Sequence, residues 1–249
     1  MKKGIALYLS AALLAALLSG CGQPTATEET SGAASAPESV AEETTPTPEP
    51  ATPAPTEEPV EEPAEETEEE YVPGERTDTD YTNTTLGLYF ALPETMVMAS
   101  DDEINQLMQV TAEMMYEDPA TGEKIIDYSQ LTTVYEMMAI DVATGSNVIV
   151  MSEKLPLAAI TVEQYISAME NQLKQTTVEV DFGEPESYTL GSTEFTRLNY
   201  SVTSNGTEMN QTMLLKKVGS RMYAIAISYP STVDVSTLLG CFSPVSETV

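Results

Sequence analysis

The sequence predicts an α+β fold for residues 81–249, with a mainly antiparallel sheet and helices packed on it. Several segments alternate apolar and polar residues, as half-buried strands do. Asn205-Gly206, the dipeptide most typical of a two-residue hairpin turn, lies between two of these segments. Two capping boxes, each followed by apolar residues at helical spacing, predict helices between the strands. Because hairpins dominate the connections, the strands are expected to pair antiparallel.

The predicted elements follow one another as a strand, a helix, a hairpin, a second helix, a meander of strands and a closing helix. The first and last strands are expected to stop at Pro93 and Pro230, because proline cannot donate to a strand ladder. Gly240 follows the closing helix, where glycine is favoured after the last turn. In chain order, we expect a strand at 84–93, a helix at 100–115, a hairpin at 131–155 and a helix at 162–173. Short strands follow at 177–185 and 186–195, then a hairpin at 195–218, a strand at 221–230 and a short helix at 232–239.

The two longer helices are each expected to begin at a capping box. Ser100 pairs with Glu103 in the first, and Thr161 pairs with Gln164 in the second. The first helix also carries aspartates in its opening turn, where the helix dipole favours negative charge. This structural role explains those aspartates, so a metal site is not expected there.

Two segments at the ends of the domain carry a family resemblance. They are "LGLYFALPETM" (86–96) and "YAIAISYPSTVDVSTLLGCF" (223–242), with the predicted antiparallel centre between them. Together they resemble the PsbP/Mog1-like domains, and the likeness covers most of residues 81–249. The resemblance implies an α/β/α sandwich with an accessory or binding role. It implies no reaction and transfers no site residue.

Two similar stretches, "MMYEDPATGEKIID" (114–127) and "MMAIDVATGSNVIV" (137–150), form an internal echo. Both contain Met-Met, Asp and Ala-Thr-Gly in register. An internal duplication is one explanation. Shared turn chemistry is the simpler one, because aspartate and glycine recur in tight turns for separate physical reasons.

The N-terminus has the pattern of an export signal. Two lysines precede an almost wholly apolar run over 5–18, which is shorter than the roughly 20 residues that span a bilayer. The run ends in Leu-Ser-Gly-Cys (18–21), which resembles the lipobox of bacterial lipoproteins. The resemblance implies cleavage between Gly20 and Cys21 and lipidation of the Cys21 thiol, so that residues 1–20 are the signal peptide. The alternative is an ordinary signal peptide followed by a chance cysteine.

Residues 21–80 are predicted to be the lipidated cysteine and a disordered tether. The stretch "TTPTPEPATPAPTEEPVEEPAEETEEE" (44–70) offers almost no apolar surface to offset the entropy of ordering it. Proline and mutually repelling glutamates should make this tether stiffer than a Gly/Ser linker. A spacer that holds the domain away from the membrane is the favoured interpretation. A ligand for proline-binding modules and a glycosylated stalk are the alternatives.

Composition excludes several kinds of chemistry. The 249 residues carry a formal net charge of −30 and contain no histidine. Nucleic acid is therefore not expected as a partner, and Ser-His, Cys-His and His-metal sites are excluded. No glycine-rich phosphate loop and no cysteine pair with zinc spacing occurs. Cys241, the only cysteine besides Cys21, is expected to be a small core residue without a disulfide partner.

Acidic residues and methionines leave weaker alternatives. Calcium is conceivable at acids that lack EF-hand spacing, and paired carboxylates could hydrolyse glycosides. The thioethers of Met96 and Met98 could bind Cu(I), although gap-filling in the core is favoured for the methionines, and a methionine-rich binding face stays open. The candidate calcium ligands are Asp101, Asp102, Asp181, Glu184 and Glu186.

These observations predict a lipoprotein outside the cytoplasm, held to the cell membrane through Cys21. The domain is expected to be a non-catalytic binding or accessory module of the cell envelope, without a cofactor or metal and with an unknown envelope protein or small ligand as partner. A solute- or cation-binding lipoprotein that serves a transporter is the alternative. A carboxylate-based hydrolase is a third hypothesis.

Overall fold

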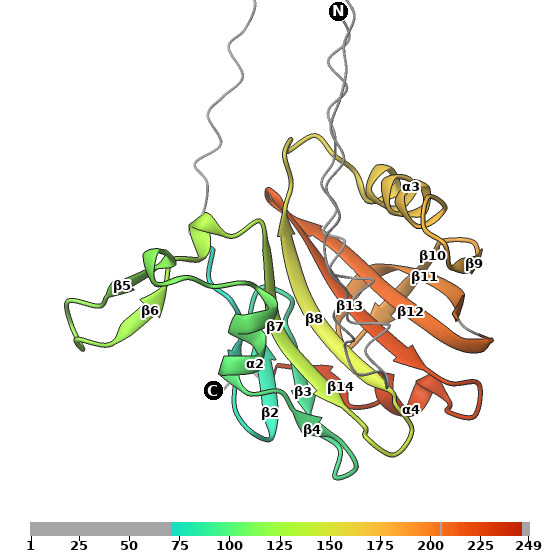
Figure 1. Cartoon of the computed structure of the whole chain (residues 1–249), viewed down its shortest axis with the longest axis horizontal. Coiled ribbons are helices and arrows are strands. Elements are labelled where there is room, and N and C mark those ends of the chain that lie inside the picture. The colour runs from blue at the N-terminus through green and yellow to red at the C-terminus, as the bar shows by residue number, and fades with distance from the viewer. Residues whose placement is uncertain (1–70, 205, 246–249) are drawn as a thin grey trace, which may run out of the picture. The chain divides into compact units, whose positions relative to one another are not determined.

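The computed structural model describes residues 71–204 and 206–245 as one α+β unit (Figure 1). The expected signal peptide, the lipidation site at Cys21 and the tether up to residue 70 lie outside the described residues. Among the residues described, no helix is long and apolar enough to cross a membrane.

The larger sheet confirms the predicted antiparallel architecture. Seven of its eight strands follow the order β10-β11-β12-β13-β8-β7-β4, and the eighth, β9, lies off this path and pairs with β11. Every pairing in this sheet is antiparallel. The strands are β4 (Val97–Met98), β7 (Thr133–Ile140), β8 (Asn147–Lys154), β9 (Glu179–Phe182), β10 (Glu186–Leu190), β11 (Thr193–Ser204), β12 (Thr207–Val218) and β13 (Arg221–Tyr229).

A second, four-stranded antiparallel sheet was not predicted. It has the order β1-β2-β3-β14, and only β3 coincides with an expected strand. The other three strands are too short for their side chains to show a clear alternation in sequence. The bounds are β1 (Glu75–Arg76), β2 (Asp80–Asn83), β3 (Leu88–Ala91) and β14 (Phe242–Pro244).

The two faces of the larger sheet are covered differently. Helices α2 (Asp101–Leu107) and α3 (Val162–Leu173) pack on one face, over a core that includes Ile166 and Met213. The four-stranded sheet and the short helix α4 (Val235–Leu239) pack on the other, around Phe90 and Ile225 (Figure 1). The α/β/α sandwich implied by the family resemblance is therefore replaced by a layer of helices, the large sheet, and a mixed layer of sheet and helix.

Local sequence signals located the starts of both longer helices and one hairpin turn correctly. Both capping boxes form, with Ser100 and Thr161 at the N-caps of α2 and α3. Ser204 pairs with Thr207 across the predicted two-residue turn, and Gly206 has a φ of 78°, the left-handed geometry that such a turn requires.

The helix expected over 100–115 is much shorter than predicted. It ends at Leu107, and Gln109 then adopts a left-handed φ of 55°. The β-branched Val110 and Thr111 that follow are poor helix formers, so nothing local restores the helix. A 3₁₀ turn, η1 (Ala112–Met114), leads instead into a strand.

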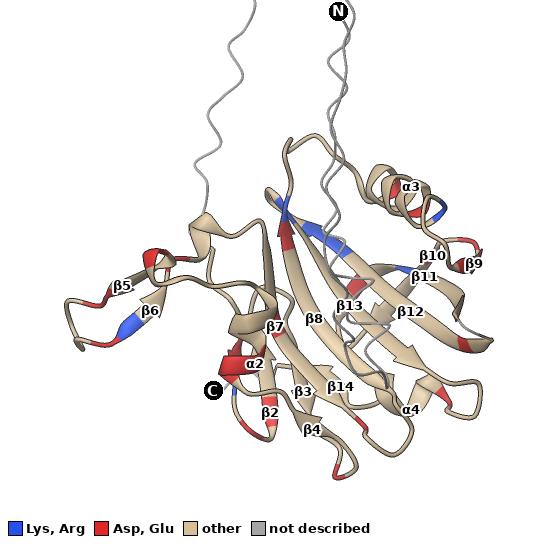
Figure 2. Ribbon diagram, in the orientation of Figure 1, with Lys and Arg blue, Asp and Glu red and all other residues tan. Residues whose placement is uncertain are grey.

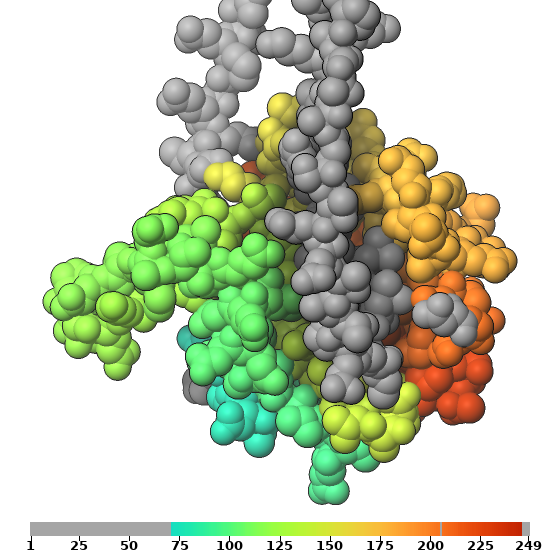
Figure 3. Space-filling view, viewed as in Figure 1, coloured from blue at the N-terminus to red at the C-terminus, as the bar shows by residue number. Residues whose placement is uncertain are grey.

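That strand belongs to a projecting hairpin formed by β5 (Met115–Glu117) and β6 (Lys124–Ile126). Figures 1 and 3 show this hairpin standing out from the sheets. Its turn repeats that of the β7–β8 hairpin: the N–H of Gly122 donates to the carbonyl of Asp118 at 2.7 Å, and that of Gly145 donates to Asp141 at 2.8 Å. The two glycines have φ values of 74° and 75°. The internal echo in the sequence thus coincides with two hairpin turns of the same geometry, as shared turn chemistry would produce.

Candidate functional site

A buried glutamate in β7 organises one end of the molecule. Glu136 is the extra residue of a β-bulge between Tyr135, which faces α2 and α3, and Met137, which faces the smaller sheet. Its carboxylate accepts four hydrogen bonds, and the residue as a whole is 5% exposed. The donors are the Tyr71 hydroxyl at 2.8 Å, the Gly74 N–H at 2.7 Å, the Tyr81 hydroxyl at 2.6 Å and the Asn83 amide at 2.9 Å.

Burial and the charge of Glu136 keep its tyrosine partners protonated. Burial raises the pKa of Tyr71 well above its usual range, and the nearby Glu136 raises it further. The same two causes, in the same order, raise the pKa of Tyr81. Both hydroxyls are therefore hydrogen-bond donors to the carboxylate throughout the physiological pH range.

The segment 71–76 is held against the sheets by further contacts. The Arg221 guanidinium lies 3.7 Å from the centroid of the Tyr71 ring, a cation–π arrangement. Ser152 donates to the Tyr71 hydroxyl at 2.9 Å and accepts from Arg221 at 3.2 Å. A side chain at Gly74 would place its Cβ 2.5 Å from the ring of Tyr81, so this close approach requires glycine.

These contacts correct the expected start of the domain. Residues 71–80, predicted to lie in the tether, contain β1 and the first residue of β2 and supply two of the four donors to Glu136. This start could not be predicted from the sequence, because a two-residue strand carries no periodic signal.

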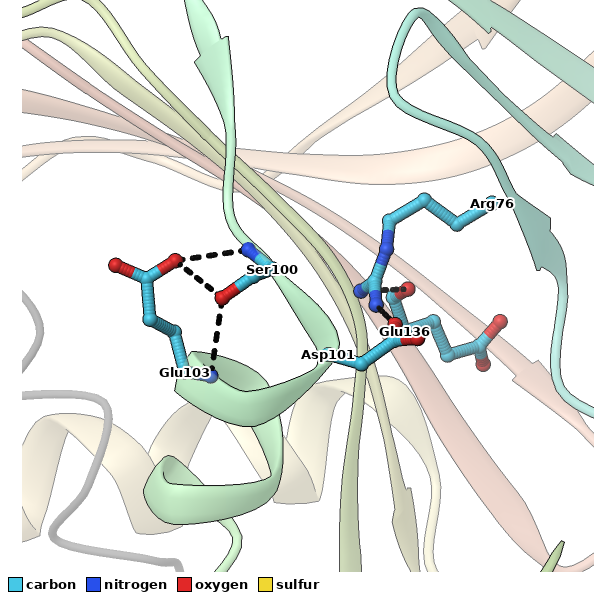
Figure 4. A network of polar contacts seen from close by, with 5 residues as sticks. All are labelled: Arg76, Ser100, Asp101, Glu103 and Glu136. Carbon is cyan, nitrogen blue, oxygen red and sulfur yellow. Dashed lines mark hydrogen bonds and ion pairs between the residues drawn. The ribbon is translucent and has the colours of Figure 1, made fainter.

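Arg76 connects this segment to helix α2. Its guanidinium donates to the backbone carbonyl of Glu136 at 3.2 Å and forms an ion pair with Asp101 (Figure 4). Figure 4 also shows the Ser100–Glu103 capping box at the start of the same helix. Arg76 thus joins β1, the bulge of β7 and the first turn of α2.

A pocket of about 480 Å³ lies beside this network. Its lining comes from the segment 71–76, α2, β7, the 3₁₀ turn η2 (Tyr128–Gln130) and the β5–β6 hairpin. Charged groups on the lining include the Arg76–Asp101 pair and Lys124. The apolar lining includes Ile104, Met108, Met115, Ile126 and Val134.

The β5–β6 hairpin, which forms one wall of the pocket, exposes two large apolar side chains. Tyr116 and Ile125 lie opposite each other on β5 and β6, and they are 50% and 38% exposed. Within the described residues, β5 and β6 form a sheet of their own. An isolated two-stranded hairpin is marginally stable in water, so this element gains from contacts on its apolar side chains.

The candidate calcium ligands are not brought together. Asp101 is paired with Arg76 on α2, beside the β4–β7 edge of the large sheet, whereas Asp181 lies on β9 and Glu186 on β10, at the other edge. Glu186 is engaged with Arg197 at 2.8 Å. Over residues 71–204 and 206–245, no group of three or more His, Cys, Asp or Glu side chains could hold a metal ion.

Methionines and Cys241 occupy mainly packing positions. Met96 and Met137 are buried in the core beside the smaller sheet. The core beneath α2 and α3 contains Met151, Met169, Met213 and Met222. Met108 and Met115, in contrast, line the pocket. Cys241 is partly buried, donates to the carbonyl of Thr237 at 3.3 Å, and has its pKa raised by burial, which disfavours the reactive thiolate.

A second buried carboxyl group predicts a pH dependence of stability. Glu153 in β8 is 3% exposed and accepts from the Tyr165 hydroxyl at 2.8 Å. Burial raises the pKa of Glu153 above 4.5, and the hydrogen bond from Tyr165 opposes part of that rise. A carboxyl group with a raised folded-state pKa binds its proton more tightly when folded. The folded state therefore loses stability as the pH rises from about 4.5 through the raised value.

We expect Glu153→Gln to remove this contribution. Its free energy of unfolding, measured by urea titration, should fall less between pH 5 and pH 8 than that of the wild type. Tyr165→Phe, which removes the opposing hydrogen bond, should steepen the fall. An unchanged pH profile in Glu153→Gln would contradict this account.

The described fold is similar to the solution structure of cyanobacterial PsbP (CyanoP) from Synechocystis sp. PCC 6803. The two chains are 12% identical, with a TM-score of 0.41, and the match covers 67% of this chain and 91% of the other. The similarity is distant and concerns the fold alone. No family model and no curated protein sequence matches the chain.

Glu136, its donors and the pocket were not predicted from the sequence. The one signal that pointed toward the hairpin wall was the internal echo. Because the second copy of "DxATG" lies in a predicted hairpin turn, the first copy (residues 118–122) indicates a second hairpin at β5–β6.

Proposed function

We propose that this protein is a lipid-anchored, extracytoplasmic binding module of the cell envelope that works without catalysis. The observation that carries the binding role is the pocket walled by the β5–β6 hairpin, with Tyr116 and Ile125 exposed on that wall. Apolar side chains with a few polar groups around a concave space are the usual make-up of a binding site. The partner is an envelope protein that covers the hairpin.

The anchor is supported by the sequence. The apolar run over 5–18 followed by Leu-Ser-Gly-Cys has the pattern of a lipobox, which supports lipidation of Cys21. The acidic, proline-rich segment between Cys21 and Tyr71 then acts as the spacer between membrane and domain. The resemblance of residues 86–96 and 223–242 to PsbP/Mog1-like domains supports an accessory rather than a catalytic role.

A small-solute binder is the second candidate. The pocket volume of about 480 Å³ falls in the range of roughly 300–1,000 Å³ that small-molecule sites occupy. The exposed Tyr116–Ile125 pair favours a protein partner, because a solute enclosed in the pocket would leave much of this pair in water.

Site-specific crosslinking on intact cells tests the binding role. A photoreactive amino acid at position 116 should give a discrete adduct, because the hairpin contacts the partner. The matched control is position 157, where Leu157 is 49% exposed but does not line the pocket. Adducts at both positions, or at neither, would overturn the proposal.

Replacement of the lipidated cysteine tests the anchor separately. Cys21→Ser should accumulate as unprocessed precursor without incorporated lipid, since the thiol is the site of acylation. Labelling with a radioactive fatty acid and the size of the protein on a gel report the result. Normal processing of Cys21→Ser would instead indicate an ordinary signal peptide.

A further inference from the structure

We propose that the partner contributes an extended, basic segment whose apolar residues enter the pocket beside the hairpin. This inference rests on the proposed function and specifies the chemistry of the partner. Three features of the molecule support it: the charge of the pocket rim, the apolar lining and the edges of the hairpin.

The elements that form the rim of the pocket, α2 and the β5–β6 hairpin, carry mainly acidic residues, and most of these lie outside the lining itself. In the stretch 101–127, which forms α2 and the hairpin, Lys124 is the only basic residue. Figure 2 shows acidic residues on both elements. The exposed acids of this stretch include Asp102, Glu103, Glu113, Glu117 and Glu123.

The nearby cations do not offset this charge. Arg76 is engaged by Asp101 and by the backbone carbonyl of Glu136, and Lys124 lies directly across the strand pair from Glu117. A positively charged segment is therefore attracted to this rim, and an anionic ligand is repelled.

The lining of the pocket accepts apolar side chains of varied shape. Met108, the C-cap residue of α2, and Met115, the first residue of β5, both line the pocket. Methionine side chains are flexible and polarisable, so they adjust to different apolar groups. A basic segment with interspersed apolar residues therefore complements both the rim and the lining.

The hairpin also favours an extended partner. In the part of the chain that the structure describes, β5 and β6 pair only with each other, so each has an outer edge available for strand addition. Peptides that add to such an edge gain affinity from backbone hydrogen bonds and specificity from alternate side chains. This arrangement places every second side chain of the partner on the same face as Tyr116 and Ile125.

Binding of two defined peptides tests the inference. The protein used is the chain from Gly22 to Val249, which retains every described residue. One fluorescent peptide alternates lysine with leucine and tyrosine, and the second has glutamate in place of lysine. We expect the lysine peptide to bind, the glutamate peptide not to bind, and affinity to fall on the order of tenfold between about 0.05 M and about 0.5 M salt.

A pair of matched double variants locates the contact. Glu117→Gln with Glu123→Gln should weaken binding of the lysine peptide by on the order of tenfold, because both acids lie on the hairpin. Glu179→Gln with Glu184→Gln changes the net charge equally, at and beside β9 near the other edge of the large sheet, and should change affinity less than about twofold.

Equal effects of the two double variants, equal binding of both peptides, or binding of neither would overturn the basic-segment inference. The proposed function would stand in each case if position 116 still gives its adduct on cells. Loss of that adduct with retained binding of the lysine peptide would instead overturn the envelope role and leave the peptide site intact.

Discussion

A chain that begins at Tyr81 is expected to be about 3–5 kcal/mol less stable than one that begins at Tyr71. The deletion removes β1 and two of the four donors to Glu136, the Tyr71 hydroxyl and the Gly74 N–H. It also removes Arg76, which joins the bulge of β7 to α2. When a buried carboxylate loses hydrogen-bond donors, the loss of stability exceeds what those hydrogen bonds contributed, because the desolvation of the carboxylate is no longer compensated.

Urea unfolding of three chains, starting at residues 22, 71 and 81, measures this effect. Comparison with the chain from residue 71 separates the effect on stability of removing residues 22–70 from the effect of removing residues 71–80. Most domains have only about 5–15 kcal/mol of stability, so the shortest chain should unfold at a much lower urea concentration or fail to fold. Equal midpoints for the chains from 71 and 81 would show that the segment contributes little.

Glu136→Ala is expected to lower the free energy of unfolding by about 3–5 kcal/mol. The substitution leaves buried hydroxyl, amide and backbone donors without an acceptor, and water does not reach them easily, since Tyr81 and Asn83 are each 1% exposed. Each orphaned donor costs about 1–3 kcal/mol, and the neighbouring side chains relax only in part.

Glu136→Gln distinguishes lost hydrogen bonds from a lost charge. One carboxylate oxygen, Oε2, accepts from Gly74, Tyr81 and Asn83, and Oε1 accepts from Tyr71. A glutamine can keep its amide oxygen at the position of Oε2, where it still accepts from three donors. Glu136→Gln should therefore lower the free energy of unfolding by only about 1–2 kcal/mol. Glu179→Ala, an exposed control on β9, should change stability by less than about 0.5 kcal/mol. Equal stability of Glu136→Ala and the wild type would exclude Glu136 as the centre of this network.

The Glu136 network also determines the shape of the pocket. Glu136, Gly74 and Arg76 all contribute to its lining, and Arg76 holds Asp101 at the first turn of α2. Disruption of the network should therefore weaken binding at the hairpin as well as stability. The variants that test binding were placed on Glu117 and Glu123, which are exposed and outside this network, so that the two effects can be separated.

The errors of sequence interpretation were confined to short elements. Strands of eight or more residues, such as β7, β11 and β12, show their alternation and were predicted close to their observed bounds. Strands of two to four residues were missed, except β3 and β9, which lie within the expected segments 84–93 and 177–185. The first helix was predicted too long because its apolar spacing continues past Leu107 although the backbone does not.

The sequence by itself determined the α+β class, the antiparallel pairing and the capped helices, because alternation, turn chemistry and capping each act over a few neighbouring residues. It also excluded histidine chemistry outright. Only the tertiary structure placed Glu136 among its donors, which lie 53 to 65 residues away in the chain. The pocket likewise combines segments separated by dozens of residues, and no local pattern encodes a contact of that range. Packing between the sheets brought these groups together, and with them the surface on which we expect the partner to bind.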